Sequence, residues 1–383
     1  MPDPPKPAMA PTSNKTRVLI VDDSAFMRKV LETIFNSDPQ LQVAGHAKDG
    51  REAVALAESL RPDVITMDIN MPHVDGLQAT AQIMTTNPRP IVIVSSESRE
   101  GASSTLKALE LGAIEFVGKP SGAIDLDMQS VREELLRKVK MAAKVRVVRT
   151  ASRLAATLQS SSTPPVPVSR PAIAPTPSAS ANLDQRFPVV VLAASTGGPA
   201  TVMRLAPGFT KEFPGALILV QHMPASFTTQ YAAQLAEFTE IRVKEAEHGE
   251  MLQPGTFYIC PGGQHLKVNP LGRVQLDGAT GRIAGYLPNI DVTMESVATF
   301  AGALSIAAVL TGMGADGAQG AKAIKKAGGL VIAQDEASSV IFGMPAEAIK
   351  LNVVDHVLSI DDIYAAIEKR VLAIARATPV GVR

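Results

Sequence analysis

The chain has 383 residues, 46% of them hydrophobic, and its 37 Lys and Arg are balanced by 37 Asp and Glu. At about 150 residues per domain, this length predicts two or three domains with packed cores. The charge balance gives no indication of a nucleic acid or an anionic membrane as partner. Cys260 is the lone cysteine, which excludes an intramolecular disulfide and fits the reducing cytosol. We interpret it as a small buried apolar residue.

The N-terminal 15 residues, MPDPPKPAMAPTSNK, are rich in proline and lack an apolar segment, so we expect a tail and no signal peptide. The longest apolar run, near residues 301–310, is far shorter than the about 18 residues that cross a bilayer. We therefore expect a cytoplasmic protein that is not inserted in a membrane.

Composition changes near residue 150 and again near residue 186. Residues 159–182 are dense in Pro, Ser, Ala and Thr and hold no aromatic residue, so this segment cannot bury enough apolar surface to become ordered. The expected organisation is a tail (1–15), a first domain (16–140), an extended linker (141–185), a second domain (186–375) and a C-terminal tail (376–383).

In the first domain, short apolar segments alternate with helical patterns. The expected strands are 18–21, 42–44, 64–67, 91–94 and 114–117. The expected helices are 25–35, 51–60, 76–84, 103–111 and a long amphipathic helix that ends near residue 146. This alternation predicts a parallel sheet with helices on both faces.

Polar side chains end four of these strands, in 18-VLIVDDS-24, 64-VITMDINMP-72, 91-IVIVSSES-98 and 116-FVGKP-120. The carboxyl ends of parallel strands meet at one edge of the sheet, so their side chains converge there. The residues concerned are Asp22, Asp23, Asp68, Ser95 and Lys119. Three carboxylates repel one another unless a hard cation joins them, and Mg²⁺ prefers such oxygen ligands.

These residues resemble the CheY-like receiver domains of response regulators, over about residues 16–140. The resemblance implies a flavodoxin-like fold in which Asp68 accepts a phosphoryl group from a CheA-type histidine kinase. The implied Mg²⁺ ligands are Asp22 (through water), Asp23, Asp68 and the carbonyl of Asn70, and the implied switch residues are Ser95, Phe116 and Lys119. An added phosphoryl group brings about −1.5 to −2 charges, which can draw a hydroxyl and an ammonium group inward.

After the linker the alternation resumes, with expected strands at 189–194, 216–220, 306–310 and 330–333. Between about 241 and 293 lie turn-rich strands such as 253-QPGTFYICPGG-263, which we interpret as hairpins. The prediction is a doubly wound parallel α/β domain with a β-hairpin insertion.

Three strand ends of this domain carry reactive side chains, in 189-VVVLAASTGG-198, 216-ALILVQHMP-224 and 306-IAAVLTGMGADGA-318. The shared strand direction predicts that Ser195, His222 and Asp316 meet in one crevice. A serine becomes a nucleophile when a base removes its proton, and a carboxylate orients that base. Backbone N–H groups of Gly197, Gly198 and the turn 311–317 can form an oxyanion hole.

Other assignments of these residues are open. The absence of G-x-S-x-G and the order Ser, His, Asp disfavour a lipase-type enzyme. The segment Gly312–Gly317 matches G-x-G-x-x-G between a strand and a helical pattern, which makes dinucleotide binding an alternative, although it leaves Ser195 and His222 without a role. No helix-turn-helix pattern or basic stripe indicates DNA binding.

The second domain resembles the catalytic domain of chemotaxis receptor methylesterases (the CheB family) over about residues 185–375. The resemblance lies in STGG, QHMPASFT, PGTFYICPGGQH and LTGMGADGA, and in the order receiver, tether, esterase. It implies a nucleophile Ser195, a base His222, an orienting Asp316, an oxyanion-hole N–H from Met313, and Thr196 beside the nucleophile. The implied enzyme is a carboxylic ester hydrolase without a cofactor. It removes γ-methyl groups from glutamates of methyl-accepting chemoreceptors and deamidates glutamines.

One segment departs from the family pattern. The chain reads 286-YLPNIDV-292 where the family usually has His-Arg-Pro before Ser-Val-Asp, so Asp291 is kept and the basic residues are lost. This departure bears on the target protein more than on hydrolysis. The competing hypothesis is a receiver with a non-catalytic domain that docks on receptors or kinases. For the enzyme, we expect the unphosphorylated receiver to cover the crevice and phosphorylation of Asp68 to weaken that contact.

Overall fold

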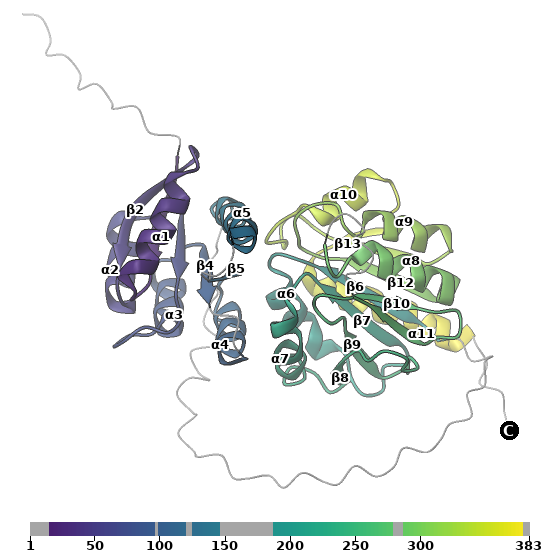
Figure 1. The fold of residues 1–383 in the computed structure, drawn as a ribbon. Coiled ribbons are helices and arrows are strands. Elements are labelled where there is room, and N and C mark those ends of the chain that lie inside the picture. The colour runs from purple at the N-terminus through teal and green to yellow at the C-terminus, as the bar shows by residue number, and fades with distance from the viewer. Residues whose placement is uncertain (1–14, 96–98, 120–124, 146–186, 279–285, 378–383) are drawn as a thin grey trace, which may run out of the picture. The chain divides into compact units, whose positions relative to one another are not determined.

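The computed structural model describes residues 15–95, 99–119, 125–145, 187–278 and 286–377. The chain divides into two compact units, built on a five-stranded and a seven-stranded sheet (Figure 1). The expected tails and linker lie almost wholly outside the described residues. Within the described ranges, no helix combines the length and hydropathy that crossing a membrane requires.

The first sheet is parallel throughout, with strand order β2-β1-β3-β4-β5. Its strands are β1 (Thr16–Val21), β2 (Leu41–Ala47), β3 (Val64–Met67), β4 (Ile91–Ser95) and β5 (Glu115–Gly118). The helices that alternate with them along the chain are α1 (Ala25–Asn36), α2 (Gly50–Leu60), α3 (Gly76–Thr86), α4 (Arg99–Glu110) and α5 (Asp125–Ala142). The central strand β3 is buried at all four residues, as expected for a strand with apolar side chains on both faces.

The helices α1, α2 and α3 begin where the sequence supplies an N-cap. The side chains of Ser24, Asp49 and Asp75 each accept a hydrogen bond from a backbone N–H in the first turn. These caps fix where each strand-to-helix loop ends, and the loop after β1 carries Asp22 and Asp23.

The second sheet is also parallel throughout, with strand order β14-β13-β12-β6-β7-β9-β8. Its strands are β6 (Val189–Ala194), β7 (Ala216–Gln221), β8 (Arg242–Glu245), β9 (Thr256–Ile259), β12 (Ser305–Val309), β13 (Leu330–Gln334) and β14 (His356–Leu358). Its helices are α6 (Gly198–Leu205), α7 (Ala225–Leu235), α8 (Ile290–Ala301), α9 (Ala318–Lys326), α10 (Met344–Lys350) and α11 (Ile360–Ala377), with short 3₁₀ turns at Ala206–Gly208 and Gly302–Leu304. An antiparallel hairpin, β10 (His265–Val268) and β11 (Val274–Asp277), is inserted between β9 and α8.

The predicted fold class is confirmed, with one correction. The segment 253–263 was expected to form a hairpin, but it holds β9, which pairs in parallel with β7 and β8. All four residues of β9 are buried, as in the other central strands. Its Pro- and Gly-rich flanks mark the ends of a strand without indicating its direction. For this reason the sequence pattern led to the wrong prediction of a hairpin. The hairpin insertion is β10–β11.

Strand β6 lies where the strand order reverses. The chain proceeds from β6 to β7 on one side and later returns to β12 on the other side. Such a switch point opens a crevice at the carboxyl ends of the strands. The segments that follow β6, β7 and β12 are those that carry Ser195, His222 and Asp316.

Candidate functional site

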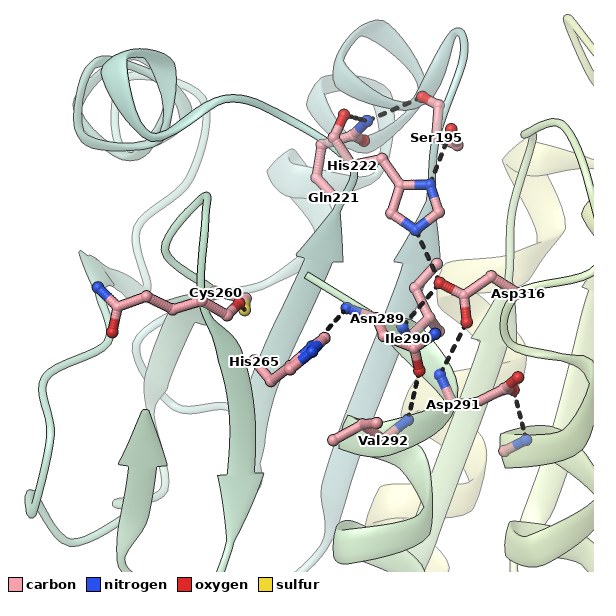
Figure 2. A network of polar contacts seen from close by, with 12 residues as sticks. Ser195, Gln221, His222, Cys260, His265, Asn289, Ile290, Asp291, Val292 and Asp316 are labelled. Atoms are coloured by element: carbon pink, nitrogen blue, oxygen red, sulfur yellow. Dashed lines mark hydrogen bonds and ion pairs between the residues drawn. The ribbon is translucent and has the colours of Figure 1, made fainter. Parts of the chain in front are cut away.

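Ser195, His222 and Asp316 are brought together at the carboxyl edge of the second sheet (Figure 2). Ser195 directly follows β6, and His222 directly follows β7. The parallel register pairs Ala194 with Gln221. The next residues, Ser195 and His222, therefore leave the sheet at the same level. Asp316 comes from the turn between β12 and α9.

The three side chains form a continuous hydrogen-bonded chain. The Oγ of Ser195 lies 3.1 Å from Nδ1 of His222, and Nε2 of His222 lies 2.8 Å from Oδ2 of Asp316. The tautomer with hydrogen on Nε2 donates to the carboxylate and leaves the lone pair of Nδ1 facing the hydroxyl. The imidazole is 9% exposed and the carboxylate 4%, so both act in a largely dry setting. This is the arrangement that converts a serine hydroxyl into a nucleophile.

Asp316 is also held in place by the first residues of α8. Its carboxylate accepts backbone hydrogen bonds from Ile290 at 2.9 Å and Asp291 at 3.0 Å, which are the first residues of α8. Free N–H groups at a helix N-terminus favour a negative charge. Helix α8 therefore fixes the position of the carboxylate that faces the imidazole.

The backbone around the nucleophile is braced from two neighbouring segments. The N–H of Ser195 donates to the Thr311 carbonyl at 3.0 Å, and the side-chain amide of Gln221 donates to the Ser195 carbonyl at 2.8 Å. The Thr311 hydroxyl also donates to the carbonyl of Thr196, which is itself buried in the turn after Ser195. The nucleophile therefore sits on a loop with little freedom to move.

The glycine-rich turn packs against the nucleophile. A Cβ added at Gly312 would lie 2.8 Å from the Cβ of Ser195 and 2.2 Å from the sulfur of Met344, so only glycine fits there. The N–H groups of Thr311 and Gly312 already donate to Gln334 and Ile341. The turn thus allows the segment that carries Asp316 to pack closely against Ser195. Because the N–H groups of Thr311 and Gly312 are already bonded within the protein, they are not available to the phosphates of a dinucleotide.

The expected oxyanion donors are only partly available. The N–H of Gly198 donates to the Ser195 carbonyl at 2.8 Å, so the expectation that it binds the oxyanion is wrong. The sequence could not indicate this because the acceptor is a backbone carbonyl three residues earlier. Met313 lies in the turn next to Gly312, and its role in the oxyanion hole stays a prediction.

Two neighbours of the triad were missed in the sequence. The ring of Tyr286 stacks on the imidazole of His222, with ring centroids 4.1 Å apart and planes at 15°. The Nδ1 of His265 accepts the N–H of Asn289 at 3.1 Å, and burial, with Lys267 adding to it, lowers the pKa of this histidine and favours its neutral form. The sequence placed His265 in a polar turn, whereas it is buried in β10.

A cavity of about 370 Å³ adjoins the triad on the side of Asp316. Its lining includes Tyr286, Asn289, Asp291, Gln319 and Glu347. Burial raises the pKa of Asp291, although its carboxylate accepts a hydrogen bond of 2.6 Å from Gly320 in the first turn of α9. The segment 286–292, which departs from the family pattern, therefore forms part of the wall beside the triad.

The acidic residues of the first unit also converge. The Nζ of Lys119 lies 3.0 Å from Asp22 and 2.8 Å from Asp68. Asp22, Asp23 and Asp68 each offer a carboxylate oxygen within 4.8 Å of the others. Burial raises the pKa of Asp68, and the ion pair with Lys119 offsets part of this effect. Three oxygens so close together suit a hard divalent cation.

The other residues expected at this site lie in or near strands β3, β4 and β5. Ser95 is buried at the end of β4, and Phe116 is buried in β5 with the Nζ of Lys138 5.1 Å from its ring centroid. Asn70 is exposed, and its backbone donates to Asp68. The roles of Ser95, Phe116 and Asn70 in switching and metal binding stay predictions.

Comparison with known proteins gives matches to both units. Residues 190–367 match the CheB methylesterase family, and residues 18–131 match the response regulator receiver domain. The "Protein-glutamate methylesterase/protein-glutamine glutaminase" of Pyrococcus abyssi is 42% identical over 354 residues, with 92% of each chain covered. That of Halalkalibacterium halodurans is 41% identical over 351 residues, covering 91% of this chain and 96% of its own. The Thermotoga maritima CheB methylesterase catalytic domain, a crystal structure, is 38% identical and covers 48% of this chain and 98% of its own, with a TM-score of 0.46.

Proposed function

Because this chain belongs to the CheB methylesterase family, we propose that it is a protein-glutamate methylesterase and protein-glutamine glutaminase whose activity is regulated through its receiver domain. It hydrolyses γ-methyl esters of glutamate and deamidates glutamines in chemotaxis signalling. The observation that carries this conclusion is the hydrogen-bonded chain from Ser195 through His222 to Asp316.

In the mechanism that we propose, Ser195 Oγ attacks the ester carbonyl while Nδ1 of His222 takes its proton. The imidazolium that forms is stabilised by the Asp316 carboxylate, which the first backbone N–H groups of α8 hold in place. Collapse of the tetrahedral intermediate releases methanol, which takes the proton back from His222. A water molecule activated in the same way then hydrolyses the acyl-enzyme to glutamate. With a glutamine substrate, the leaving group is ammonia.

In the receiver, we propose that Asp68 accepts the phosphoryl group and that Lys119 stabilises the product. Asp22, Asp23, Asp68 and the carbonyl of Asn70 would hold Mg²⁺, which supplies charge neutralisation when it is bound. The burial of Asp68 next to the ammonium group of Lys119 supports this assignment. The same proposal names a CheA-type histidine kinase as donor, methyl-accepting chemoreceptors as substrate, and the cytoplasm as location.

The decisive experiment is methanol release from methylated receptor membranes. The Ser195→Ala variant should lose several orders of magnitude in rate relative to wild type, with and without a phosphoryl donor. Ser59→Ala, which alters an exposed serine on α2, serves as the control and should retain full activity. If Ser195→Ala keeps the wild-type rate, the second domain is a docking module and the proposed function is wrong.

A further inference from the structure

We propose that Tyr286 is a positioning residue for the base, which orients the imidazole of His222 and stabilises the imidazolium form that appears during catalysis. This inference rests on the proposed function. Its direct basis is the parallel stack of the two rings, at 4.1 Å between centroids and 15° between planes. Neither the family matches nor the charge pattern of 286–292 assigns a role to this side chain.

The two hydrogen bonds of His222 do not by themselves fix the tilt of its ring. Nδ1 is bonded to Ser195 and Nε2 to Asp316, so both bonds lie near the line that joins these two nitrogens. Rotation about this line tilts the ring plane while it preserves the two distances. An aromatic ring packed parallel to the imidazole opposes that tilt, because tilting drives ring atoms into the neighbour. Tyr286 therefore adds to the restraint that the two hydrogen bonds and the covalent attachment at Cβ place on the ring.

Tyr286 is itself held between the base and the turn that carries the carboxylate. A Cβ added at Gly314 would lie 3.4 Å from the Tyr286 hydroxyl oxygen and 3.9 Å from its Cε2 atom. Gly314 has a positive φ of 89°, a backbone conformation that favours glycine. The phenol ring therefore lies close to both His222 and the turn that carries Asp316.

The stack also places the face of the tyrosine ring against the group that becomes a cation during catalysis. The face of a tyrosine ring attracts a cation, and the imidazole becomes a cation only after Ser195 has given up its proton. A contact that strengthens at that stage lowers the barrier of the chemical step, so it affects kcat and leaves substrate binding largely unchanged.

The test compares Tyr286→Leu, which removes the ring, with Tyr286→Phe, which keeps the ring and removes the hydroxyl. Two readouts are taken on the full-length protein: kcat and KM for methanol release, and the rate at which a fluorophosphonate probe labels Ser195. We expect Tyr286→Leu to lose about tenfold in kcat and in labelling rate with KM nearly unchanged, and Tyr286→Phe to stay close to wild type. Phe300→Leu is the matched control, because it removes a ring that pairs with Phe187 in the same unit.

Three outcomes overturn the inference. The first is a Tyr286→Leu variant with wild-type kcat and labelling rate. The second is an equal loss in Tyr286→Phe, which would assign the effect to the hydroxyl. The third is a loss in Phe300→Leu as large as that in Tyr286→Leu, with the same fall in Tm, which would indicate general destabilisation. Failure of the proposed function looks different: wild type would be labelled at Ser195 and release no methanol.

Discussion

At the scale of single residues, the site depends on groups that hold the reacting atoms in place. Ser195, His222 and Asp316 could be predicted from the sequence because each follows an apolar strand, and parallel strands end at one edge. Tyr286 could not be predicted, since it precedes a helix in an irregular segment and meets His222 only in the folded chain. The sequence also could not show that Gly198 is unsuited as an oxyanion donor, because residue types do not indicate which backbone groups bond to each other.

Replacing Asp316 by Asn should lower kcat by about three to four orders of magnitude. The amide is neutral and can present an N–H to Nε2, which then favours the wrong tautomer for accepting the serine proton. Steady-state methanol release measures the effect. The control is Asp361→Asn, which neutralises an exposed carboxylate that pairs with Arg204. A fall of less than about tenfold would contradict the orienting role of Asp316.

Replacing Gly312 by Ala should displace the nucleophile. The new Cβ would overlap the Cβ of Ser195 and the sulfur of Met344, and overpacking of this kind costs about 1–3 kcal/mol. We expect both a lower Tm and a slower fluorophosphonate reaction. Gly278→Ala adds the same methyl group with no atom within 4 Å and should change neither. Equal behaviour of the two variants would show that the turn is more adaptable than its packing indicates.

Removal of Lys119 should alter the pH dependence of phosphoryl acceptance by Asp68. Burial raises the pKa of Asp68, and Lys119 opposes that rise. Because the carboxylate must be ionised to act as nucleophile, Lys119→Met should raise this pKa further and move the acid limb of the phosphorylation rate to higher pH. Lys119→Arg keeps the charge and should shift the limb less. Chelation of divalent ions should abolish phosphorylation in all three proteins, and a limb that moves to lower pH in Lys119→Met would contradict the assignment.

At the scale of elements, the strands nearest the centre of the second sheet were the most predictable. Strands β6, β7, β12 and β13 are almost wholly buried, so each reads as a continuous apolar run. The edge strands β8 and β14 have no fully buried residue, so their sequences show no continuous apolar run and neither strand was predicted individually. The direction of β9 was misread because turn residues flank parallel and antiparallel strands alike.

Helix α9 should lose stability when Asp291 is replaced by Ala. Its N-cap residue, Gly317, has no capping side chain, and Asp291 on α8 accepts the N–H of Gly320 instead. Loss of a cap costs about 1 kcal/mol, which thermal unfolding can detect as a lower Tm. Asp291→Asn keeps a neutral acceptor and should lose less. Identical melting of wild type and Asp291→Ala would show that α9 does not need this bond.

At the scale of the whole molecule, the chain divides into two compact units. The units match different families, at residues 18–131 and 190–367. A receiver tethered to an enzyme remains at a high effective concentration near it, so a weak interaction suffices for regulation. The phosphoryl group must favour one state over the other, and a shift from 1:99 to 99:1 requires about 5.5 kcal/mol.

The fragment 185–383 should therefore hydrolyse receptor esters faster than the unphosphorylated full chain. A phosphoryl donor should raise the rate of the full chain toward that of the fragment and leave the fragment unaffected. Asp68→Asn should keep the full chain at its low rate in the presence of the donor. Equal rates for the fragment and the unphosphorylated chain would rule out inhibition by the receiver.

The position of β6 at the reversal of the strand order affects how activity arises during synthesis. Ser195 and His222 follow strands that are close in the sequence and can pair early, but β12 joins β6 only after more than a hundred residues. Pairing over such a distance is slow compared with local pairing. A nascent chain that ends before Ser305 already contains the hydroxyl and the imidazole, but it lacks the carboxylate. Esterase activity should therefore appear only after β12 and the turn that carries Asp316 have been made and have joined the sheet.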